Sequence, residues 1–148
     1  PLDTLLSEAD DVSLHCPLNS TTRDLIDEQT IELMKPTAFL INTARGPIVK
    51  EAALVNALAS GRIAGAGLDV FRVEPHPDNP YLEFPNVVLT PHIGGTTKEA
   101  YERSVYLSLV NVTNVFNGMA PHCQVSPEVS PRLEFVREEE PVRPPSSV

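Results

Sequence analysis

The stretch PNVVLTPHIGGTTKEA, residues 85–100, decides the fold of this chain. Its apolar run, 87–89, is typical of a buried β-strand. Thr96, with Glu99 three residues later, forms a capping box, which predicts that a helix begins at once. A strand that leads through a tight turn into a helix is the repeating unit of a parallel α/β sheet. His92 lies in that turn, between a proline and two glycines, which indicates that its position is constrained.

Strand and helix patterns alternate along residues 1–120. Four apolar or β-rich runs predict strands at 11–15, 38–41, 63–70 and 87–90. Amphipathic or alanine-rich patterns predict helices at 21–35, 51–60 and 96–117. This spacing is typical of right-handed βαβ units, so the sequence predicts an α/β fold with a parallel sheet of about four strands.

Several residues mark the expected helix ends. Thr21 and Asp24 resemble a capping pair for the first helix, and Pro36 stops it. Gly61 is placed to adopt the left-handed conformation that ends the second helix. The last 28 residues, 121–148, carry six prolines and a run of three glutamates, which predicts an extended tail rather than part of the folded domain.

The composition of the 148 residues excludes several classes of protein. Lys and Arg number 11 against 20 Asp and Glu, which gives a net charge of −9. An acidic chain without a basic stretch is a poor partner for nucleic acid or an anionic membrane surface. No apolar run approaches the ~20 residues of a membrane-spanning helix. Cys16 and Cys123 are too few for a disulfide framework and too far apart for a metal knuckle, so we expect a reduced, cytoplasmic protein without a metal site.

Polar residues follow the expected strands where the strands end. Ligands of open parallel sheets bind beyond the carboxyl ends of the strands, so these residues should meet at one edge. Arg45 can grip a carboxylate, His92 can move a proton, and Glu74 can tune the imidazole. Each of them taken singly is explained as simply by a surface position, but together they form one chemically sensible set. His76 and His122, in proline-flanked loops, are expected to face solvent.

Three motifs, in this order and spacing, resemble the D-isomer-specific 2-hydroxyacid dehydrogenases: NTARG at 42–46, GRIAGAGLDVFRVEP at 61–75 and LTPHIGG at 89–95. HCPLNSTTRDLI at 15–26 fits as well, so the resemblance covers nearly all of residues 1–120. The family implies a homodimeric oxidoreductase with a Rossmann-like, doubly wound nucleotide domain and a separate substrate domain. Its phosphate-binding GxGxxG lies upstream and has no equivalent here, so we interpret the chain as the second half of the nucleotide domain.

By position in these motifs, the resemblance implies the catalytic residues Arg45, Glu74 and His92. Arg45 would hold the substrate carboxylate, His92 would take and return the hydroxyl proton, and Glu74 would stabilise the imidazolium. Asp69 is the expected partner of the nicotinamide carboxamide. The cofactor is expected to be NAD, with NADP left open because the residue that reads the 2′ position lies upstream. The cofactor-binding residues implied are His15, Cys16, Pro17, Thr43, Ala44, Arg45, Asp69, His92, Gly94 and Gly95.

The resemblance therefore implies an enzyme that interconverts a small D-2-hydroxy acid and its 2-oxo acid by hydride transfer, with this segment inactive alone. Two rival interpretations share the scaffold. Formate dehydrogenase has glutamine where Glu74 stands, which argues against it. The C-terminal-binding-protein corepressors use the fold as an NADH-dependent interaction module but depart from PHIGG after the histidine, whereas this sequence keeps Gly94 and Gly95. The individual substrate cannot be named, because the domain that shapes its pocket is absent.

Overall fold

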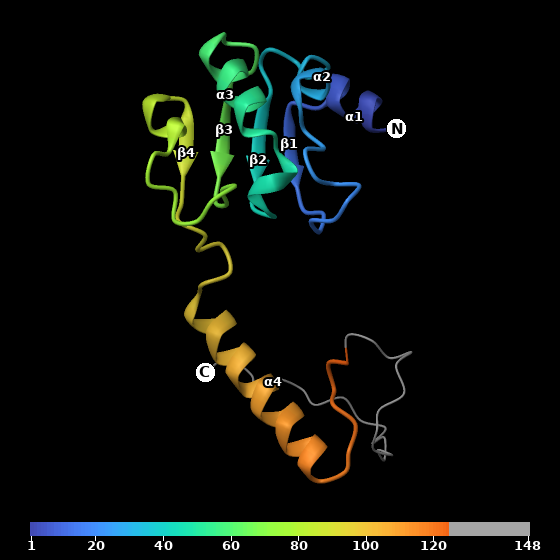
Figure 1. Ribbon diagram of the computed structural model, residues 1–148. Coiled ribbons are helices and arrows are strands. Elements are labelled where there is room, and N and C mark those ends of the chain that lie inside the picture. The colour runs from blue at the N-terminus through green and yellow to red at the C-terminus, as the bar shows by residue number, and fades with distance from the viewer. Residues whose placement is uncertain (125–148) are drawn as a thin grey trace. The chain divides into compact units, whose positions relative to one another are not determined.

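The computed structural model describes residues 1–124, which form two compact units, Pro1–Gly94 and the segment from Gly95 onward (Figure 1). The first unit contains a sheet and three α-helices, and the second contains one long helix. Nearly all of the expected tail, 121–148, lies outside the described residues, so its extended conformation stays a prediction.

The first unit alternates strands and helices in chain order, as the sequence predicts. Its four strands form one sheet in the order β1-β2-β3-β4, and every neighbouring pair is parallel. The expected α/β, Rossmann-like fold with four parallel strands is therefore confirmed. The elements are α1 (Leu2–Glu8), β1 (Asp11–Leu14), α2 (Glu28–Ile31), β2 (Phe39–Asn42), η1 (Gly46–Ile48), α3 (Glu51–Ala59), β3 (Gly65–Leu68), η2 (Pro80–Glu83) and β4 (Val87–Leu89), followed in the second unit by α4 (Lys98–Phe116).

One face of the sheet carries the core of the first unit. α1 and α2 contribute Leu6 and Ile31 to this core, and α3 contributes Ala53, Leu54, Ala57 and Leu58. Alternate strand residues point to the opposite face, where the side chains of Phe39 and Val88 are 45% and 70% exposed. Packing against the core thus fixes the four strands relative to one another, and with them the positions of their carboxyl ends. The strand residues buried in it are Val12, Leu14, Leu40, Ala66 and Leu68.

The helix expected over 21–35 is wrong for most of its length, because only α2 is helical there. The side chain of Asn19 closes a turn by accepting hydrogen bonds from the backbone N–H of Thr21 at 2.9 Å and of the next residue at 3.1 Å. Asp24, the expected capping partner of Thr21, has a φ of 52°. A left-handed residue cannot continue a right-handed helix, so the apolar spacing of this segment does not produce one.

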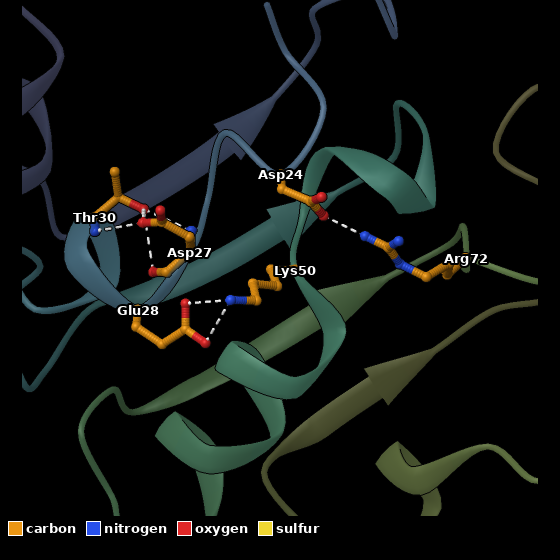
Figure 2. Close-up of polar contacts among 6 residues, drawn as sticks. All are labelled: Asp24, Asp27, Glu28, Thr30, Lys50 and Arg72. Carbon is orange, nitrogen blue, oxygen red and sulfur yellow. Dashed lines mark hydrogen bonds and ion pairs between the residues drawn. The ribbon is translucent and has the colours of Figure 1, made fainter. Parts of the chain in front are cut away.

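A different pair of residues starts α2. The backbone N–H of Thr30 donates to Asp27 Oδ1 at 2.9 Å, and the backbone N–H of Asp27 donates to Thr30 Oγ1 at 2.7 Å (Figure 2). This reciprocal capping box satisfies two donors that a helix start would leave free. Just before it, Ile26 forms an isolated parallel bridge with Val49. The buried Ile26 therefore packs as extended chain and not as part of a helix.

The bounds of the other two expected helices agree with α3 and α4 to within two residues. The short helix α1 was not expected from the sequence. The glycine after α3, Gly61, has a φ of 68°, and Gly118 after α4 has a φ of 74°. Both adopt the left-handed conformation that ends a helix. The cap of α4 lies one residue later than expected, because Thr97 and not Thr96 accepts a hydrogen bond from the backbone N–H of Ala100 at 3.1 Å.

Gly46 holds two loops of the site together. A Cβ atom at this position would lie 2.0 Å from both the carbonyl carbon and the carbonyl oxygen of Phe71. The backbone of Gly46 is not left-handed, so a turn conformation does not explain the glycine. Glycine is required here because the turn after β2 touches the backbone of the loop after β3.

Gly46→Ala should lower the free energy of unfolding by about 3 kcal/mol, since the added methyl group meets backbone that cannot rotate away. Gly67→Ala is the matched control, because a Cβ at Gly67 makes ordinary contacts of 3.8 and 3.9 Å with Ile41. Urea denaturation of the two variants beside the parent measures the difference. Equal stabilities of the two variants would contradict this role of Gly46.

Candidate active site at the carboxyl edge of the sheet

The carboxyl ends of the four strands lie at one edge of the sheet, because all neighbouring strands are parallel (Figure 1). The segments that follow β1, β2, β3 and β4 begin at residues 15, 43, 69 and 90. The expected site residues of the first unit all lie in these segments. The sheet topology therefore gathers them as the sequence predicts.

His92 and Glu74 form a direct pair at this edge. His92 Nδ1 lies 2.7 Å from Glu74 Oε2, a contact between the turn after β4 and the loop after β3. The other carboxylate oxygen of Glu74 accepts a hydrogen bond from the backbone N–H of Phe71 at 2.8 Å. Both carboxylate oxygens are thus engaged, and Nε2 of His92 is the ring nitrogen through which it can exchange a proton with a bound molecule.

The pKa of Glu74 is held below its ordinary value. The hydrogen bond with His92 has the largest effect, followed by the backbone N–H of Phe71 and by the positive charges of His92 and Arg45. Glu74 is therefore ionised at neutral pH and presents a negative charge to the imidazole.

The backbone of His92 is held in an unusual conformation. Its φ is 55°, in the left-handed region that costs a non-glycine residue about 1–2 kcal/mol. Its backbone N–H donates to the carbonyl of Thr90 at 3.1 Å, which closes the turn tightly. Such strain persists only where the surrounding structure fixes it, and it concentrates at functional positions.

Asp69 fixes the turn that carries His92 through hydrogen bonds of its carboxylate. One of its carboxylate oxygens accepts hydrogen bonds from the hydroxyl of Thr90 and the backbone N–H of Ile93, and the other accepts from the backbone N–H of Gly94. Burial opposes ionisation of Asp69, but these hydrogen bonds and the charge of His92 outweigh it and hold its pKa below the ordinary value. A Cβ at Gly94 would lie 2.9 Å from Asp69 Oδ2, so glycine allows the carboxylate to approach.

Asp69→Asn should lower the free energy of unfolding by about 2 kcal/mol at neutral pH, because hydrogen bonds to a charged acceptor are lost. A carboxylate whose pKa is lowered by folding stabilises the protein above its unfolded-state pKa of about 4, and this stabilisation is lost as the pH falls through the folded-state value. The difference between parent and variant should therefore shrink below about pH 4. Urea denaturation at a series of pH values checks it. A pH-independent difference would show that the charge of Asp69 contributes nothing.

Arg45 is presented by a turn that Asn42 organises. The side chain of Asn42 is buried; it accepts from the backbone N–H of Ala44 at 3.1 Å and donates to the carbonyl of Arg45 at 3.0 Å. Arg45 itself is exposed, and its Nη1 donates to the carbonyl of Ala44 at 2.6 Å. The backbone of Arg45 is thus fixed by hydrogen bonds. Its exposed guanidinium has further N–H donors with which it can bind a ligand.

The expected site residues line two separate cavities. One, of about 650 Å³, lies at the ends of β1 and β2, and the other, of about 410 Å³, lies at the ends of β3 and β4. The larger is lined by His15, Cys16, Pro17, Leu18, Thr43, Ala44 and Arg45. The smaller contains Glu74 and His92 among Phe71, Pro75, His76, Asn79, Leu82, Leu89, Thr90 and Pro91. Six of the residues expected around the cofactor therefore line the larger cavity, Arg45 among them, whereas Glu74 and His92 line the smaller one. Asp69 and Gly94 line neither of these two cavities.

Some residues differ from the expectation. His76 is not solvent-facing, since its side chain is only 14% exposed and its Nε2 lies 3.1 Å from Glu51 Oε2. His122 is exposed, as expected. Gly95 is the first residue of the second unit and is described with that unit alone.

Sequence reasoning missed the residues that shape the site without facing a ligand. Asn42 was seen only as the start of a motif, although a polar residue directly after three apolar ones is a signal that its side chain organises the next turn. Thr90 was read as the end of a strand, but it binds Asp69. No sequence signal identifies the backbone N–H of Phe71, because any residue except proline supplies that group.

The described part of the chain contains no helix long and apolar enough to cross a membrane. Within the same residues, no group of three or more His, Cys, Asp or Glu side chains could hold a metal ion.

The chain matches a known protein family. The family described as "D-isomer specific 2-hydroxyacid dehydrogenase, NAD binding domain" matches residues 1–94. Over 129 residues the chain is 52% identical to a glyoxylate reductase of Thermofilum pendens; the match covers 86% of this chain and 38% of that protein. The chain therefore spans well under half the length of this relative.

Solved structures give the same result. A D-lactate dehydrogenase with NAD⁺ from Lactobacillus jensenii matches with a TM-score of 0.78 and 37% identity, over 84% of this chain and 42% of that one. An acyclic imino acid reductase in complex with NADPH and D-Arg matches with a TM-score of 0.74 and 38% identity, over 79% of this chain and 38% of that one.

Proposed function

The chain belongs to the D-isomer specific 2-hydroxyacid dehydrogenases, and on this premise we propose that it is the second half of the nucleotide-binding domain of an NAD-dependent oxidoreductase. The full enzyme interconverts a D-2-hydroxy acid and its 2-oxo acid by hydride transfer. One observation carries the proposal, the 2.7 Å contact between His92 Nδ1 and Glu74 Oε2 at the carboxyl edge of the sheet. An imidazole held by a carboxylate is suited to general acid–base catalysis.

His92 is the group that moves the proton. Because Glu74 engages Nδ1, Nε2 accepts the proton of the substrate hydroxyl during oxidation and returns it to the carbonyl oxygen during reduction. The ionised Glu74 stabilises the protonated imidazole between these events. The left-handed backbone and Asp69 hold the ring, which meets the need of proton transfer for a fixed geometry.

Arg45 binds the substrate. Its guanidinium can grip the substrate carboxylate through two parallel hydrogen bonds, which also fixes the orientation of the reacting carbon. The positive charge at Arg45 favours a 2-oxo or 2-hydroxy acid over a neutral carbonyl compound. The exposure of its side chain and the fixed turn beneath it support this role.

The larger cavity suits the nicotinamide side of the cofactor. Its walls combine small or apolar groups with the imidazole of His15, the hydroxyl of Thr43 and the charge of Arg45. Apolar walls with a few polar groups are typical of cofactor pockets. We place NAD there, with NADP as the alternative, and the cofactor when bound supplies the hydride chemistry. Of the remaining residues assigned to it, Asp69 and Gly94 shape the turn that carries His92, and the contact of Asp69 with a carboxamide stays a prediction.

The small 2-oxo acid substrate, assembly of the full enzyme as a homodimer and its cytoplasmic location are also part of this proposal. The family and the acidic, cysteine-poor composition of the chain support the substrate class and the location, and the homodimer is what the resemblance in sequence implies.

The test is NADH oxidation by the full-length enzyme with glyoxylate, hydroxypyruvate and pyruvate in parallel. We expect at least one of the three to be reduced, and the product to be the D isomer wherever it is chiral. NADH binding without reduction of any of them would contradict the proposal and favour a role as a cofactor-dependent interaction module.

A further inference from the structure

A second carboxylate–imidazole pair lies close to the first. His76 Nε2 is 3.1 Å from Glu51 Oε2, and the two side chains are 14% and 30% exposed. Glu51 is the first residue of α3, a helix fixed in the core. His76 comes two residues after Glu74 and lines the same cavity as Glu74 and His92. The pair thus joins the loop that carries Glu74 to the helix α3, which is fixed in the core.

The contact of His76 with Phe71 extends this link. The two rings meet edge to face, with their centroids 6.3 Å apart and an interplanar angle of 87°. Phe71 is also the residue whose backbone N–H donates to Glu74 Oε1. His76 therefore supports the group that fixes one oxygen of Glu74, while the other oxygen contacts His92.

A separate ion pair anchors the same loop nearer its start. Arg72 pairs with Asp24, in the turn before α2 (Figure 2). The loop 71–76 is thus attached to the rest of the unit on both sides of Glu74, by Arg72 before it and by His76 after it. Two attachment points are enough to fix the position of the carboxylate between them.

The surroundings of His76 also assign its tautomer. Within residues 1–124, its Nδ1 is buried and has no hydrogen-bond partner. A buried N–H without an acceptor is costly, so the proton belongs on Nε2, which donates it to Glu51. His92 has the opposite arrangement, since its Nδ1 faces the ionised Glu74.

We propose that His76 and Glu51 form a positioning pair that holds Glu74 against His92. The inference rests on the proposed function, because it assigns the two residues an effect on the same acid–base group. Neither residue touches substrate or cofactor in this account. They act by keeping the distance between Glu74 and His92 short, so that the negative charge of Glu74 favours the protonated imidazole.

The test uses four variants of the full-length enzyme. His76→Leu and Glu51→Ala remove the pair, and His76→Gln keeps a donor close to the position of Nε2. Glu28→Ala is the matched control, because Glu28 also stands at the start of a helix and pairs with Lys50 at 2.9 Å, but does not line the cavity of Glu74 and His92. The measurements are kcat, the KM for NADH and the pH dependence of 2-oxo acid reduction.

We expect His76→Leu and Glu51→Ala to lower kcat by about tenfold, the scale expected when a catalytic group is misplaced by a fraction of an ångström. Both should also move the alkaline limit of reduction to lower pH, with little change in the KM for NADH. His76→Gln should recover most of the activity, and Glu28→Ala should behave like the parent. If His76→Leu does not fold, Glu51→Ala gives the same information.

A double-mutant cycle with Glu74→Gln separates positioning from general destabilisation. In the Glu74→Gln background, His76→Leu should cause little further loss, because the two act through one charge. Additive losses, or an unmoved pH limit, would overturn the positioning role. If Glu74→Gln alone has no effect on the pH profile, the proposed function fails. If Glu74→Gln shifts the pH profile but His76→Leu and Glu51→Ala do not, the proposed function is supported and the positioning pair is contradicted.

Discussion

His92→Ala should lower turnover of the full-length enzyme by at least about a hundredfold, the usual scale for the loss of a general acid–base group. We expect an effect of this size because the ring of His92 is paired with Glu74 and its backbone is held in a strained conformation. The KM for NADH should change little, because the proton-transfer step and not cofactor binding is affected.

His92→Asn makes the result easier to interpret. Asparagine tolerates the left-handed conformation better than alanine, so a similar loss in both variants cannot come from backbone strain. His122→Ala is the matched control, because His122 is an exposed histidine of the second unit. Turnover within a few-fold of the parent in both His92 variants would show that another group moves the proton.

Arg45→Lys should raise the KM for the 2-oxo acid at least about tenfold, although the positive charge is kept. Lysine is a point charge and cannot form the two parallel hydrogen bonds by which a guanidinium fixes a carboxylate. The orientation of the reacting carbon is lost with them, so kcat should fall as well. Steady-state kinetics with the 2-oxo acid varied at saturating NADH measures both constants.

Arg23→Lys is the matched control for this substitution, because Arg23 is an exposed arginine of the same unit outside both cavities. Its kinetics should equal those of the parent. Unchanged KM and kcat in Arg45→Lys would mean that the substrate carboxylate is bound elsewhere.

The four strands could be predicted from the sequence, with ends that agree to within two residues, because apolar runs indicate burial. The turn after β4 illustrates this: an apolar strand, a histidine between proline and glycines, and a capped helix predicted both the parallel sheet and the position of His92. The contact of His92 with Glu74 was expected from the family resemblance, and the structure contains it at 2.7 Å.

The segment before α2 could not be predicted from apolar spacing. Its buried residues recur at nearly helical intervals, but the side chain of Asn19 accepts hydrogen bonds from the backbone N–H of Thr21 and of Thr22 and fixes a turn there instead. Side-chain capture of backbone N–H groups competes with helix formation, and its outcome depends on tertiary contacts such as the bridge between Ile26 and Val49.

Long-range contacts explain the remaining differences. The sequence gives no indication that Gly46 touches the backbone of Phe71, or that Glu51 meets His76 across 25 residues of chain. Both depend on where two loops cross after the sheet has formed. The residues that hold a site in place are therefore harder to predict than the residues that face its ligand.

The pH dependence of 2-oxo acid reduction in the parent and in Glu74→Gln tests the acid–base pair most directly. Reduction requires protonated His92, and the ionised Glu74, whose pKa is lowered by this contact, favours that form. Removing the charge should let His92 lose its proton at lower pH, so the variant should lose reductase activity at a lower pH than the parent. Coincident profiles would contradict the account, because they would mean that Glu74 does not control the protonation of His92.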